Sequence, residues 1–505
     1  MAMSAATSER LQTALPVAVG LAGELSPMEA LLRVAQLPMA ILLESVQTGG
    51  DCGRYSWLSA DPFAAVRARG WELRWQYREE TVTEHGDPWL ALRRLLAPFR
   101  QWPHPLLPPF PGGLAGVWSY ELVQHLERVP RARGDEFALP ELVVGVYDWV
   151  IVWDHAAGKS WVVSTGWPEH DPHRRYRRAW ERLHQVQSWL REWEDVASRE
   201  PGAVAAGLRS PLSSGQQSSP GTAWCQQFPV PRLSGLTSNF SRQGFEAAVR
   251  RAIEYVHAGD CFQVNLAQRL LYPARLSPLA LYARLRERNP APFAGYFDAG
   301  DYTLVSASPE LFLRLNPDGW VETRPIKGTR PRGSTPAEDE RLRQELLTSG
   351  KDRAENIMIV DLLRNDLGRV CRYGTVQVAD LCRVESYRTV HHLVSVVRGQ
   401  LRPECDALDL LRATFPGGSV TGAPKVRAME IIAELEPTVR GPYCGCLGFI
   451  GFDGSAEWNI LIRTCTLAQG WIQFPVGGGI VADSDPAQEY EETLHKAEGI
   501  LRALE

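Results

Sequence analysis

Residues 323–333 read T-R-P-I-K-G-T-R-P-R-G and decide how the rest of the chain is interpreted. Their single lysine, Lys327, lies two residues after Pro325 and directly before Gly328. Proline fixes its own φ and favours an extended residue before it, whereas glycine allows a turn or a close approach of backbone. The stretch therefore predicts an extended segment that presents one amine into an anion-binding cleft.

Three more polar side chains of the stretch bear on this interpretation, a hydroxyl and two guanidinium groups suited to carboxylates. They are Thr329, Arg330 and Arg332. The alternative is a basic surface loop that closes a hairpin, since runs of charge usually mark solvated faces. The segments on either side of the stretch are needed to decide between the two.

The composition is that of an ordinary water-soluble globular protein, with 44% hydrophobic and 22% charged residues. At 505 residues the chain exceeds the roughly 250–300 residues at which one core stops growing, so two lobes or one composite domain are expected. The net charge of −5 gives no indication of a nucleic-acid or anionic-membrane partner. No apolar run approaches the roughly 20 residues of a membrane span, and the N-terminus lacks the features of a secretory signal.

Nine cysteines are scattered along the chain, and none of them forms a C-x-x-C pair. Neither a zinc site nor a disulfide framework is therefore expected, and a cytoplasmic location fits. For the close pair Cys444 and Cys446, core packing is the simplest explanation.

The sequence divides into a strand-rich region over residues 1–195, a linker over 196–235 and a denser region over 236–505. Ser, Gly, Pro, Gln and Ala dominate residues 198–221, which is typical of a flexible linker. Residues 141–166 alternate as a β-hairpin does, and Ser241 is expected to cap a helix. Later strands are expected at 293–297, 303–307, 311–315, 447–452, 458–468 and 471–476, and helices near 277–288, 336–348, 352–366, 406–413, 424–435 and 486–503. This mixture of short antiparallel strands and helices predicts an α+β architecture.

Two predicted helices each carry a pair of acids on one face. Asp352 and Glu355 lie three residues apart, as do Glu489 and Glu492, with Lys496 one turn further along. Such carboxylates suit a hard cation such as Mg²⁺, which prefers oxygen ligands. Acids near a helix start are also favoured by the helix dipole, which is the alternative explanation for each pair alone.

An anion-binding set accompanies these acids. The glycines at 477–479 can aim backbone N–H groups at an anion, although tight turns use glycine equally well. Residues 415–425 read F-P-G-G-S-V-T-G-A-P-K, a glycine-rich turn that enters a helix. Arg463 lies inside a predicted apolar strand, where it either extends its guanidinium to solvent or pairs with an anion. For His392, a hydrogen-bonded core position is the commoner explanation.

Together these segments resemble the chorismate-utilising enzymes. The matching stretches are G-D-C-F-Q-V-N-L-A-Q-R, S-A-S-P-E-L-F, R-P-I-K-G-T-R-P-R-G, A-E-N-I-M-I-V-D-L-L-R-N-D-L-G-R-V, H-L-V-S, F-P-G-G-S-V-T-G-A-P-K and G-G-G-I-V-A-D-S-D-P with E-Y-E-E-T-L-H-K-A. They span about residues 240–503 in the family's order. The resemblance implies a sandwich of two antiparallel sheets flanked by helices, to which both halves of the chain contribute strands.

Two positions distinguish members of this family. Isochorismate and salicylate synthases carry a water-activating lysine where this chain has Gln263, which argues against water as the nucleophile. Anthranilate synthases usually have a small residue in P-I-A-G-T, whereas aminodeoxychorismate synthases typically have P-I-K-G-T, as here at Lys327. The resemblance thus implies amination at C4 of chorismate for 4-aminobenzoate and folate synthesis, with Lys327 attacking C2. That chemistry requires a neutral amine, so burial or the neighbouring Arg324, Arg330 and Arg332 should lower the pKa of Lys327.

The resemblance also implies roles for other residues. Glu310 is the expected general acid for the departing C4 hydroxyl, and a raised pKa would favour that role. The implied Mg²⁺ ligands are Glu355, Glu489 and Glu492, with Asp352 beside them. The implied chorismate contacts are Gln263, Thr329, His392, Ser419, Tyr443, Arg463, Gly478, Gly479 and Lys496.

The N-terminal region resembles anthranilate and aminodeoxychorismate synthases, and poorly matches isochorismate synthases. The residues similar to a tryptophan pocket are Glu44, Ser45, Arg54, Tyr55 and Ser56, and whether they regulate or only support the fold stays open. No G-x-C-x-G glutaminase signature is present, so a separate glutamine amidotransferase subunit is expected to supply ammonia.

Two other functions remain to be weighed. The first is an anthranilate synthase component of tryptophan synthesis with an unusual lysine. The second is a catalytically silent tryptophan-binding or scaffold subunit. Such a subunit should have lost the acids or the lysine, and the sequence keeps both.

Overall fold

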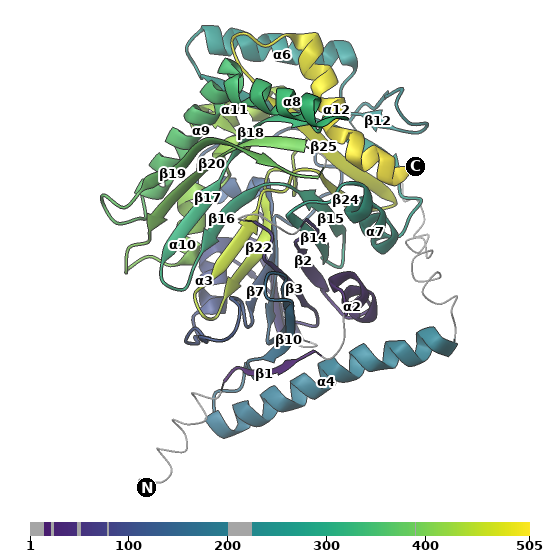
Figure 1. Cartoon of the computed structure of the whole chain (residues 1–505), viewed down its shortest axis with the longest axis vertical. Coiled ribbons are helices and arrows are strands. Elements are labelled where there is room, and N and C mark those ends of the chain that lie inside the picture. The colour runs from purple at the N-terminus through teal and green to yellow at the C-terminus, as the bar shows by residue number, and fades with distance from the viewer. Residues whose placement is uncertain (1–14, 22–24, 48–51, 78–79, 200–224, 389) are drawn as a thin grey trace.

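Two antiparallel β-sheets dominate the computed structural model of the chain (Figure 1). The structure describes residues 15–21, 25–47, 52–77, 80–199, 225–388 and 390–505. Every strand pair within these ranges is antiparallel, and helices cover the outer faces of both sheets. The predicted fold class, a two-sheet antiparallel sandwich flanked by helices, is confirmed.

The first sheet has thirteen strands in the order β1-β10-β9-β3-β2-β14-β15-β24-β25-β13-β12-β11, with β21 paired to β13. Its strands are β1 (Val17–Gly20), β2 (Ile41–Glu44), β3 (Tyr55–Ser59), β9 (Trp149–Asp154), β10 (Lys159–Ser164), β11 (Phe228–Pro229), β12 (Thr237–Ser238), β13 (Gln263–Pro273), β14 (Phe293–Asp298), β15 (Thr303–Ser308), β21 (Gly422–Ala423), β24 (Thr464–Ala468) and β25 (Trp471–Ile480).

The second sheet has twelve strands in the order β18-β20-β17-β16-β23-β22-β7-β8-β4-β5-β6, with β19 paired to β20. Its strands are β4 (Ala64–Arg69), β5 (Glu72–Tyr77), β6 (Glu80–His85), β7 (Gly113–Trp118), β8 (Leu142–Tyr147), β16 (Leu311–Leu315), β17 (Trp320–Arg324), β18 (Ile326–Pro331), β19 (Gln377–Ser386), β20 (Val390–Gln400), β22 (Cys446–Gly451) and β23 (Ala456–Asn459).

Most of the helices begin where a side chain caps their free N–H groups, whereas the helix that starts at Lys425 has Pro424 before it and no side-chain cap. Ser241 accepts from the N–H of Gly244 at 3.0 Å, which confirms it as the cap of α6. The helices are α2 (Pro27–Val34), α3 (Pro88–Leu96), α4 (Pro172–Arg199), α6 (Arg242–His257), α7 (Pro278–Arg288), α8 (Pro336–Thr348), α9 (Gly350–Gly368), α10 (Ala407–Thr414), α11 (Lys425–Leu435) and α12 (Pro486–Leu504), with short 3₁₀ turns η1 (Tyr120–His125) and η2 (Gly418–Val420).

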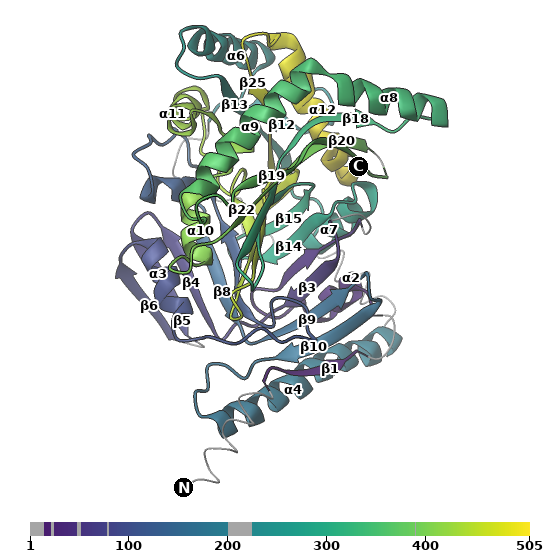
Figure 2. The same cartoon turned by 60° about the vertical axis from the view of Figure 1, so that its left-hand side comes forward.

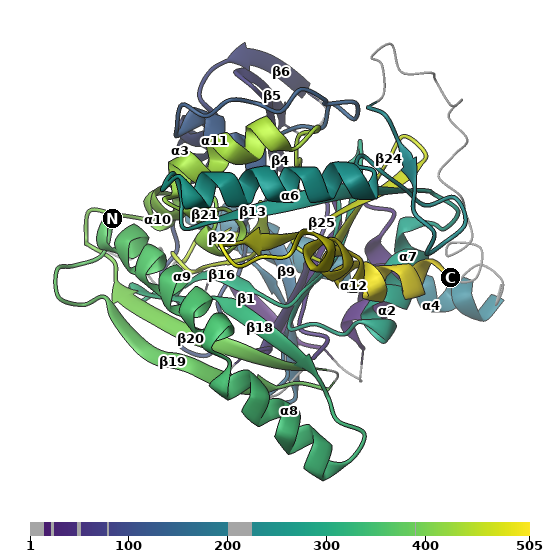
Figure 3. The same cartoon turned by 90° about the horizontal axis from the view of Figure 1, so that it is seen from above.

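Three apolar layers hold the sandwich together. One lies between the first sheet and its helices, with α12 along β25 and α6 near β13 when seen from above (Figure 3). A second joins the second sheet to α3, α9 and α10. The third fills the space between the sheets and includes Ile41, Val143, Phe297 and Phe449. Burial of these side chains is the main stabilising contribution to the fold.

Both regions set apart in the sequence contribute to both sheets. Strand β2 pairs with β14, and β7 pairs with β22, so the early strands continue the later ones (Figure 2). Most of the predicted linker, residues 200–224, lies outside the described residues. In the described part of the chain, no helix is long and apolar enough to cross a membrane.

Two strand predictions were wrong in the same way. Residues 458–468 form not one strand but β23 and β24, which belong to different sheets. Residues 141–166 form the predicted hairpin only from β9 onward, because β8 belongs to the second sheet and the chain changes sheets at Asp148. Strands β8 and β9, and likewise β23 and β24, consist almost entirely of buried residues. The apolar pattern of the sequence therefore continues through the point where the chain changes sheets.

All nine cysteines are free, and Cys444 and Cys446 are buried as expected from core packing.

Candidate active site

Lys327 lies in an extended strand, as the sequence predicts, and not in a loop that closes a hairpin. Strands β17 and β18 both pair with β20 and follow each other along it, separated only by Pro325. The register advances from Ile326 to Thr329 on β18 but by only two residues on β20, so Lys327 and Gly328 form a bulge. A bulge redirects a side chain out of the regular strand pattern, and Gly328 supplies the φ of +85°.

The amine of Lys327 is directed at the glycine-rich turn. Its Nζ donates a hydrogen bond to the backbone oxygen of Ser419, with an N···O distance of 3.1 Å. Burial lowers the pKa of Lys327 below its ordinary value, and the ammonium group of Lys496 lowers it further. The carboxylates of Glu355, Glu310 and Glu492 oppose this shift. The amine is thus closer to neutrality than a solvated lysine.

Burial, one of the two expected causes, contributes most to the lowered pKa of Lys327, whereas the three arginines of the same segment are not among its main causes. Each arginine is paired with carboxylates: Arg324 with Glu322 and Glu385, Arg330 with Glu345 and Asp352, and Arg332 with Asp339. The cation that acts on Lys327 is Lys496, which comes from the distant helix α12.

Glu310 and Lys327 each make a hydrogen bond with Ser419. The Ser419 hydroxyl donates to Glu310 Oε1 at 2.6 Å, while the Ser419 backbone oxygen accepts from Lys327. Glu310 is only 5% exposed, and burial raises its pKa to about 7, against the hydrogen bond from Ser419 and the charge of Lys327. A carboxyl with this pKa can hold a proton near neutral pH and donate it.

Two polar groups beside this pair have no partner among the described residues. Gln263 is fully buried, yet neither its amide oxygen nor its amide nitrogen makes a hydrogen bond. Its side chain lies against the Cα of Gly479, where a Cβ would collide with it. Arg463 has no side-chain hydrogen bond or ion pair in the described chain, and burial lowers its pKa. Arg463 is half-buried, whereas a fully buried amide such as that of Gln263 is costly unless a ligand satisfies it.

The environments of Arg463 and of the three glycines differ from the predictions. Arg463 lies between β23 and β24 with a φ of +52°, not inside a strand. The glycines at 477–479 belong to strand β25 and pair with β13, so they do not form a turn. The pairing of β25 with β24 ends at Gln473, which leaves the other edge of these glycines without a strand partner in the described part.

Two acids of α12 approach the glycines at 477–479. A Cβ placed on Gly478 would lie 3.2 Å from Glu489 Oε2 and 3.5 Å from Glu492 Oε1. Burial raises the pKa of Glu355 and of Glu489, and the charge of Glu492 contributes to both shifts. Burial also acts to raise the pKa of Glu492, but Lys496, Lys351 and Lys327 outweigh it and the pKa is lowered.

These acids fit a hard cation by chemistry rather than by preformed geometry. Carboxylate oxygens from two helices are the ligand type that Mg²⁺ prefers. In the described residues, however, no three Asp, Glu, His or Cys side chains are close enough to hold an ion as they stand. Glu492 contacts Lys496 at 2.7 Å, Glu489 accepts from Ser484, and Asp352 pairs with Arg330.

Three further residues predicted to contact chorismate are Thr329, His392 and Tyr443. Thr329 Oγ1 lies 2.9 Å from His392 Nδ1, and burial lowers the pKa of His392 to about 4, so the ring is neutral. His392 is therefore a hydrogen-bonded buried histidine, as the commoner explanation held. Tyr443 is buried, and the Arg440 guanidinium lies 5.7 Å from the centre of its ring.

Two residues near the site were not singled out in the sequence. The charge of Lys351 acts on Glu355, Glu489 and Glu492, and its only sequence signal is its place next to Asp352. Arg440 donates to the backbone oxygen of Val420, next to Ser419. An arginine in the apolar P-T-V-R-G-P-Y segment is the signal that could have identified it.

The five tryptophan-pocket candidates lie elsewhere, at the junction of β2 and β3. Four of the five side chains bond within the chain: Glu44 with Tyr282 and Arg286, Ser45 with the backbone oxygens of Tyr55 and Pro292, Ser56 with His155, and Arg54 with Asp154. The cavity that Glu44, Ser45 and Tyr55 help to line leaves about 20 Å³ for the centres of water molecules, room for about one water.

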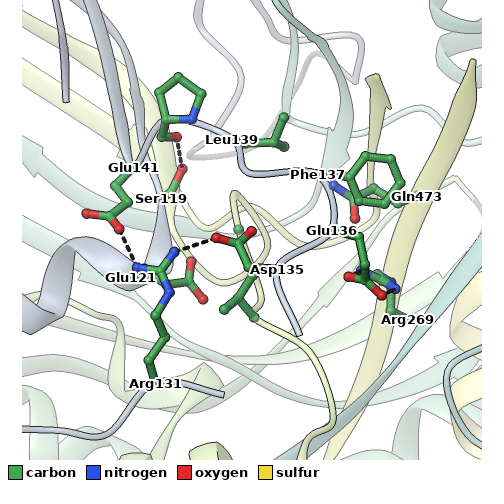
Figure 4. Close-up of a pocket in the computed structure, with 13 residues that line it drawn as sticks. Ser119, Glu121, Arg131, Asp135, Glu136, Phe137, Leu139, Glu141, Arg269 and Gln473 are labelled. Carbon is green, nitrogen blue, oxygen red and sulfur yellow. Dashed lines mark hydrogen bonds and ion pairs between the residues drawn. The ribbon is translucent and has the colours of Figure 1, made fainter. Parts of the chain in front are cut away.

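A further polar cavity lies beside η1, and Figure 4 shows Arg131 paired with Glu141 and Asp135, while Glu121 accepts from the backbone N–H of Arg440. Arg131 contacts Glu141 at 2.6 Å and Asp135 at 2.8 Å, and Arg269 contacts Glu136 at 2.8 Å. None of the predicted site residues lines this cavity. The site around Lys327 is therefore the stronger candidate for catalysis.

Comparisons with known proteins identify the family of this site. The model of the chorismate binding enzyme family matches residues 52–502. The chain is 41% identical to anthranilate synthase component 1 of Thermus thermophilus, over 95% of each chain. It is 39% identical to aminodeoxychorismate synthase component 1 of Salmonella typhimurium, over 94% of each chain.

Solved structures agree with this result. Anthranilate synthase component I of Streptococcus pneumoniae superposes with a TM-score of 0.71 at 30% identity, over 90% of this chain and 93% of that one. The menaquinone-specific isochorismate synthase of Escherichia coli shares the fold with a TM-score of 0.67 at 16% identity, over the full length of both. The chain belongs to the chorismate-binding enzyme family.

Proposed function

We propose that the chain replaces the C4 hydroxyl of chorismate with an amino group, as aminodeoxychorismate synthase component 1 does. The observation that carries this proposal is the amine of Lys327, which has a lowered pKa and shares Ser419 with Glu310. Amination at C2 alone needs no such amine, because ammonia can attack that carbon directly. A nucleophilic lysine gives the site a way to direct ammonia to C4.

The first half of the reaction uses Lys327 and Glu310. The neutral Nζ bonds to C2 of chorismate, the two conjugated ring double bonds shift from C1=C2 and C5=C6 to C1=C6 and C4=C5, and the C4–oxygen bond breaks. Glu310 gives its proton to the departing hydroxyl, which leaves as water. The product of this half is a C2 adduct with a positively charged secondary amine, next to an ionised Glu310.

The second half restores both residues. Ammonia bonds to C4, both ring double bonds shift back to C5=C6 and C1=C2, and Nζ leaves C2 as a neutral amine with its two protons. The extra proton of the new C4 ammonium passes to Glu310. The net reaction joins chorismate and ammonia into 4-amino-4-deoxychorismate and water, so atoms and charge balance.

The unpartnered groups of the site would bind the substrate. We assign Arg463 and the amide of Gln263 to the polar groups of chorismate, with Tyr443, Thr329 and the free edge of the 477–479 glycines beside them. Glu355, Glu489 and Glu492 would hold Mg²⁺, which supplies positive charge for the ring carboxylate. The raised pKa values of Glu355 and Glu489 support this assignment, since a cation would offset the burial and the charge of Glu492 that raise them.

Ammonia would come from a separate glutamine amidotransferase subunit. The named relatives are "component 1" proteins, a name that implies a second component, and the sequence lacks a glutaminase signature. As part of this proposal we place the chain in the cytoplasm, where nine free cysteines are compatible with reducing conditions.

Product identity tests the proposal. The full chain is incubated with chorismate, MgCl₂ and ammonium chloride, and products are identified by mass and by added aminodeoxychorismate lyase. We expect a product that the lyase converts to 4-aminobenzoate. Lys327→Ala should reduce its formation by about 10³-fold or more, because the attacking group is gone.

The second candidate function is anthranilate synthesis. It is favoured by relatives of that name at 41% and 42% identity, similar to the aminodeoxychorismate synthases. Anthranilate from the unmodified chain, undiminished in Lys327→Ala, would overturn the C4 proposal and establish this one. No turnover with either ammonium or an amidotransferase partner would favour a silent subunit.

A further inference from the structure

The bulge that carries Lys327 is held from one side by the first turn of α9. A Cβ built on Gly328 would lie 2.8 Å from Asp352 Cγ and 2.9 Å from Asp352 Oδ1, so the carboxylate packs directly on this glycine. The other oxygen, Oδ2, lies 3.2 Å from Arg330 Nη2. Both oxygens of Asp352 therefore face strand β18.

Arg330 extends this contact to two helices. Its Nε donates to Glu345 of α8 at 2.8 Å, and its Nη2 donates to Asp352 of α9. Its Nη1 returns to the backbone oxygen of Thr329 at 3.0 Å. These contacts fix the backbone directly after the bulge to α8 and α9. The two helices follow β18 in the chain (Figure 2).

The carboxylate of Asp352 is directed at a different strand from those of Glu489 and Glu492. Glu489 and Glu492 face Gly478, and the charges that act on Glu355 are those of Lys327, Lys351, Asp352 and Glu492. The carboxylate of Asp352 instead contacts Arg330 and packs against Gly328. Sequence spacing and the family resemblance placed Asp352 beside the metal ligands, but neither shows which way a short side chain turns.

We propose that Asp352 is a positioning residue for Lys327 and not a ligand of a divalent cation. It clamps Gly328 and holds Arg330, and so fixes the bulge that aims the Lys327 amine at Ser419 and Glu310. This inference rests on the proposed function, in which Lys327 is the nucleophile. A displacement of about 1 Å at such a group can cost about 100-fold in rate.

Side-chain length and charge separate the two roles. As a metal ligand, position 352 would need a carboxylate, so Asp352→Glu would be tolerated and Asp352→Asn would not. As a positioning residue it needs its length, because the glycine it packs on leaves no space for another methylene. Asp352→Asn keeps the length and an oxygen for Arg330, whereas Asp352→Glu does not fit.

The test compares these two variants with Arg330→Gln and with a metal-site control, Glu492→Gln. For each full-length protein, kcat and the Mg²⁺ concentration for half-maximal rate are measured with chorismate and ammonium chloride. We expect Asp352→Glu and Arg330→Gln to lower kcat by about 10- to 100-fold. Neither should change the Mg²⁺ requirement, which Glu492→Gln should raise. Asp352→Asn should stay within a few-fold of the unmodified chain on both measures.

A second measurement does not depend on the reaction product. Lys327 is labelled with methyl acetimidate in the absence of substrate, and the labelled peptide is quantified by mass spectrometry across a pH series. We expect Asp352→Glu and Arg330→Gln to change the pH profile of labelling at Lys327 and not at Lys159, which lies in the distant strand β10. Because no substrate is present, the labelling result can be interpreted even if the enzyme does not make the expected product.

The opposite order of effects would overturn the inference. If Asp352→Glu keeps the original kcat while Asp352→Asn raises the Mg²⁺ requirement as Glu492→Gln does, Asp352 is a metal ligand. If Arg330→Gln leaves both kcat and Lys327 labelling unchanged, the clamp does not position the lysine.

Discussion

The site around Lys327 and the N-terminal cavity each bury one glutamate to the same degree. Glu310 is 5% exposed and Glu44 is 4% exposed. Glu44 contacts the guanidinium of Arg286 and accepts from the Tyr282 hydroxyl at 2.7 Å. Glu310 has the hydroxyl of Ser419 as its side-chain partner, and its pKa rises to about 7.

The difference extends to the neighbours of each glutamate. Around Glu44, Ser45, Ser56 and Arg54 are all bonded within the chain. Around Glu310, the amide of Gln263 and the guanidinium of Arg463 have no described partner. Partnered polar groups stabilise the fold, whereas unpartnered ones cost stability and are retained where a ligand can use them. On this basis we infer that the N-terminal cavity is structural and that the lysine site is where a ligand binds.

The largest expected effect separates the two glutamates by activity. Glu310→Gln removes the proton donor for the C4 hydroxyl and should lower kcat by about 10²- to 10⁴-fold, measured with chorismate and ammonium chloride. Glu44→Gln is the matched control, with the same change in an equally buried side chain. At temperatures below its melting temperature, Glu44→Gln should have a kcat within about two-fold of that of the unmodified chain. Equal losses in both variants would contradict the assignment of Glu310 as the acid.

The same two variants should move stability in opposite directions. Glu44→Gln leaves Arg286 without its anion and should lower the free energy of unfolding by about 2 kcal/mol. Glu310→Gln removes a buried carboxyl whose ionised form has no cationic partner at hydrogen-bonding distance among the described residues, so it should stabilise the protein at pH 8.

The pH dependence follows from the sign of the shift at Glu310. Its folded-state pKa is about 7 and its ordinary value is 4.5, so the folded chain binds the proton more tightly. Its contribution to stability is therefore greatest below pH 4.5 and falls as the pH rises to 7, by up to about 3 kcal/mol. Chemical denaturation at pH 5 and pH 8 measures this: the advantage of Glu310→Gln should be larger at pH 8. An advantage that is equal at both pH values would contradict the raised pKa.

The contrast also shows how far the sequence alone could lead. Motif order predicted the two-sheet fold, and local signals such as Ser241 predicted helix starts, because both depend on nearby residues. The exchange of strands between sheets at Asp148 and before Arg463 was not predicted, because residues on both sides of each break are buried and the apolar pattern shows no interruption.

Charge partners were the hardest part of the site to predict. The sequence placed Arg324, Arg330 and Arg332 next to Lys327, yet their partners lie in β19, α8 and α9. The cation that acts on Lys327 comes from α12. Neighbours in an extended strand point to alternate faces, so closeness in sequence does not place two charges together.

The smallest expected effect concerns tryptophan. The N-terminal cavity has room for about one water, and its polar groups are already bonded, so tryptophan could enter only by breaking the bonds of Ser45 or Glu44. A ligand with no affinity for the folded state does not shift its stability. We therefore expect 1 mM tryptophan to leave both the melting temperature and the rate with ammonium chloride unchanged. Glu44→Gln, in which the cluster is already broken, serves as the comparison. A rise in melting temperature with tryptophan in the unmodified chain, lost in Glu44→Gln, would show that this region binds a ligand as the lysine site does, and that its internal bonds are exchanged for those of the ligand.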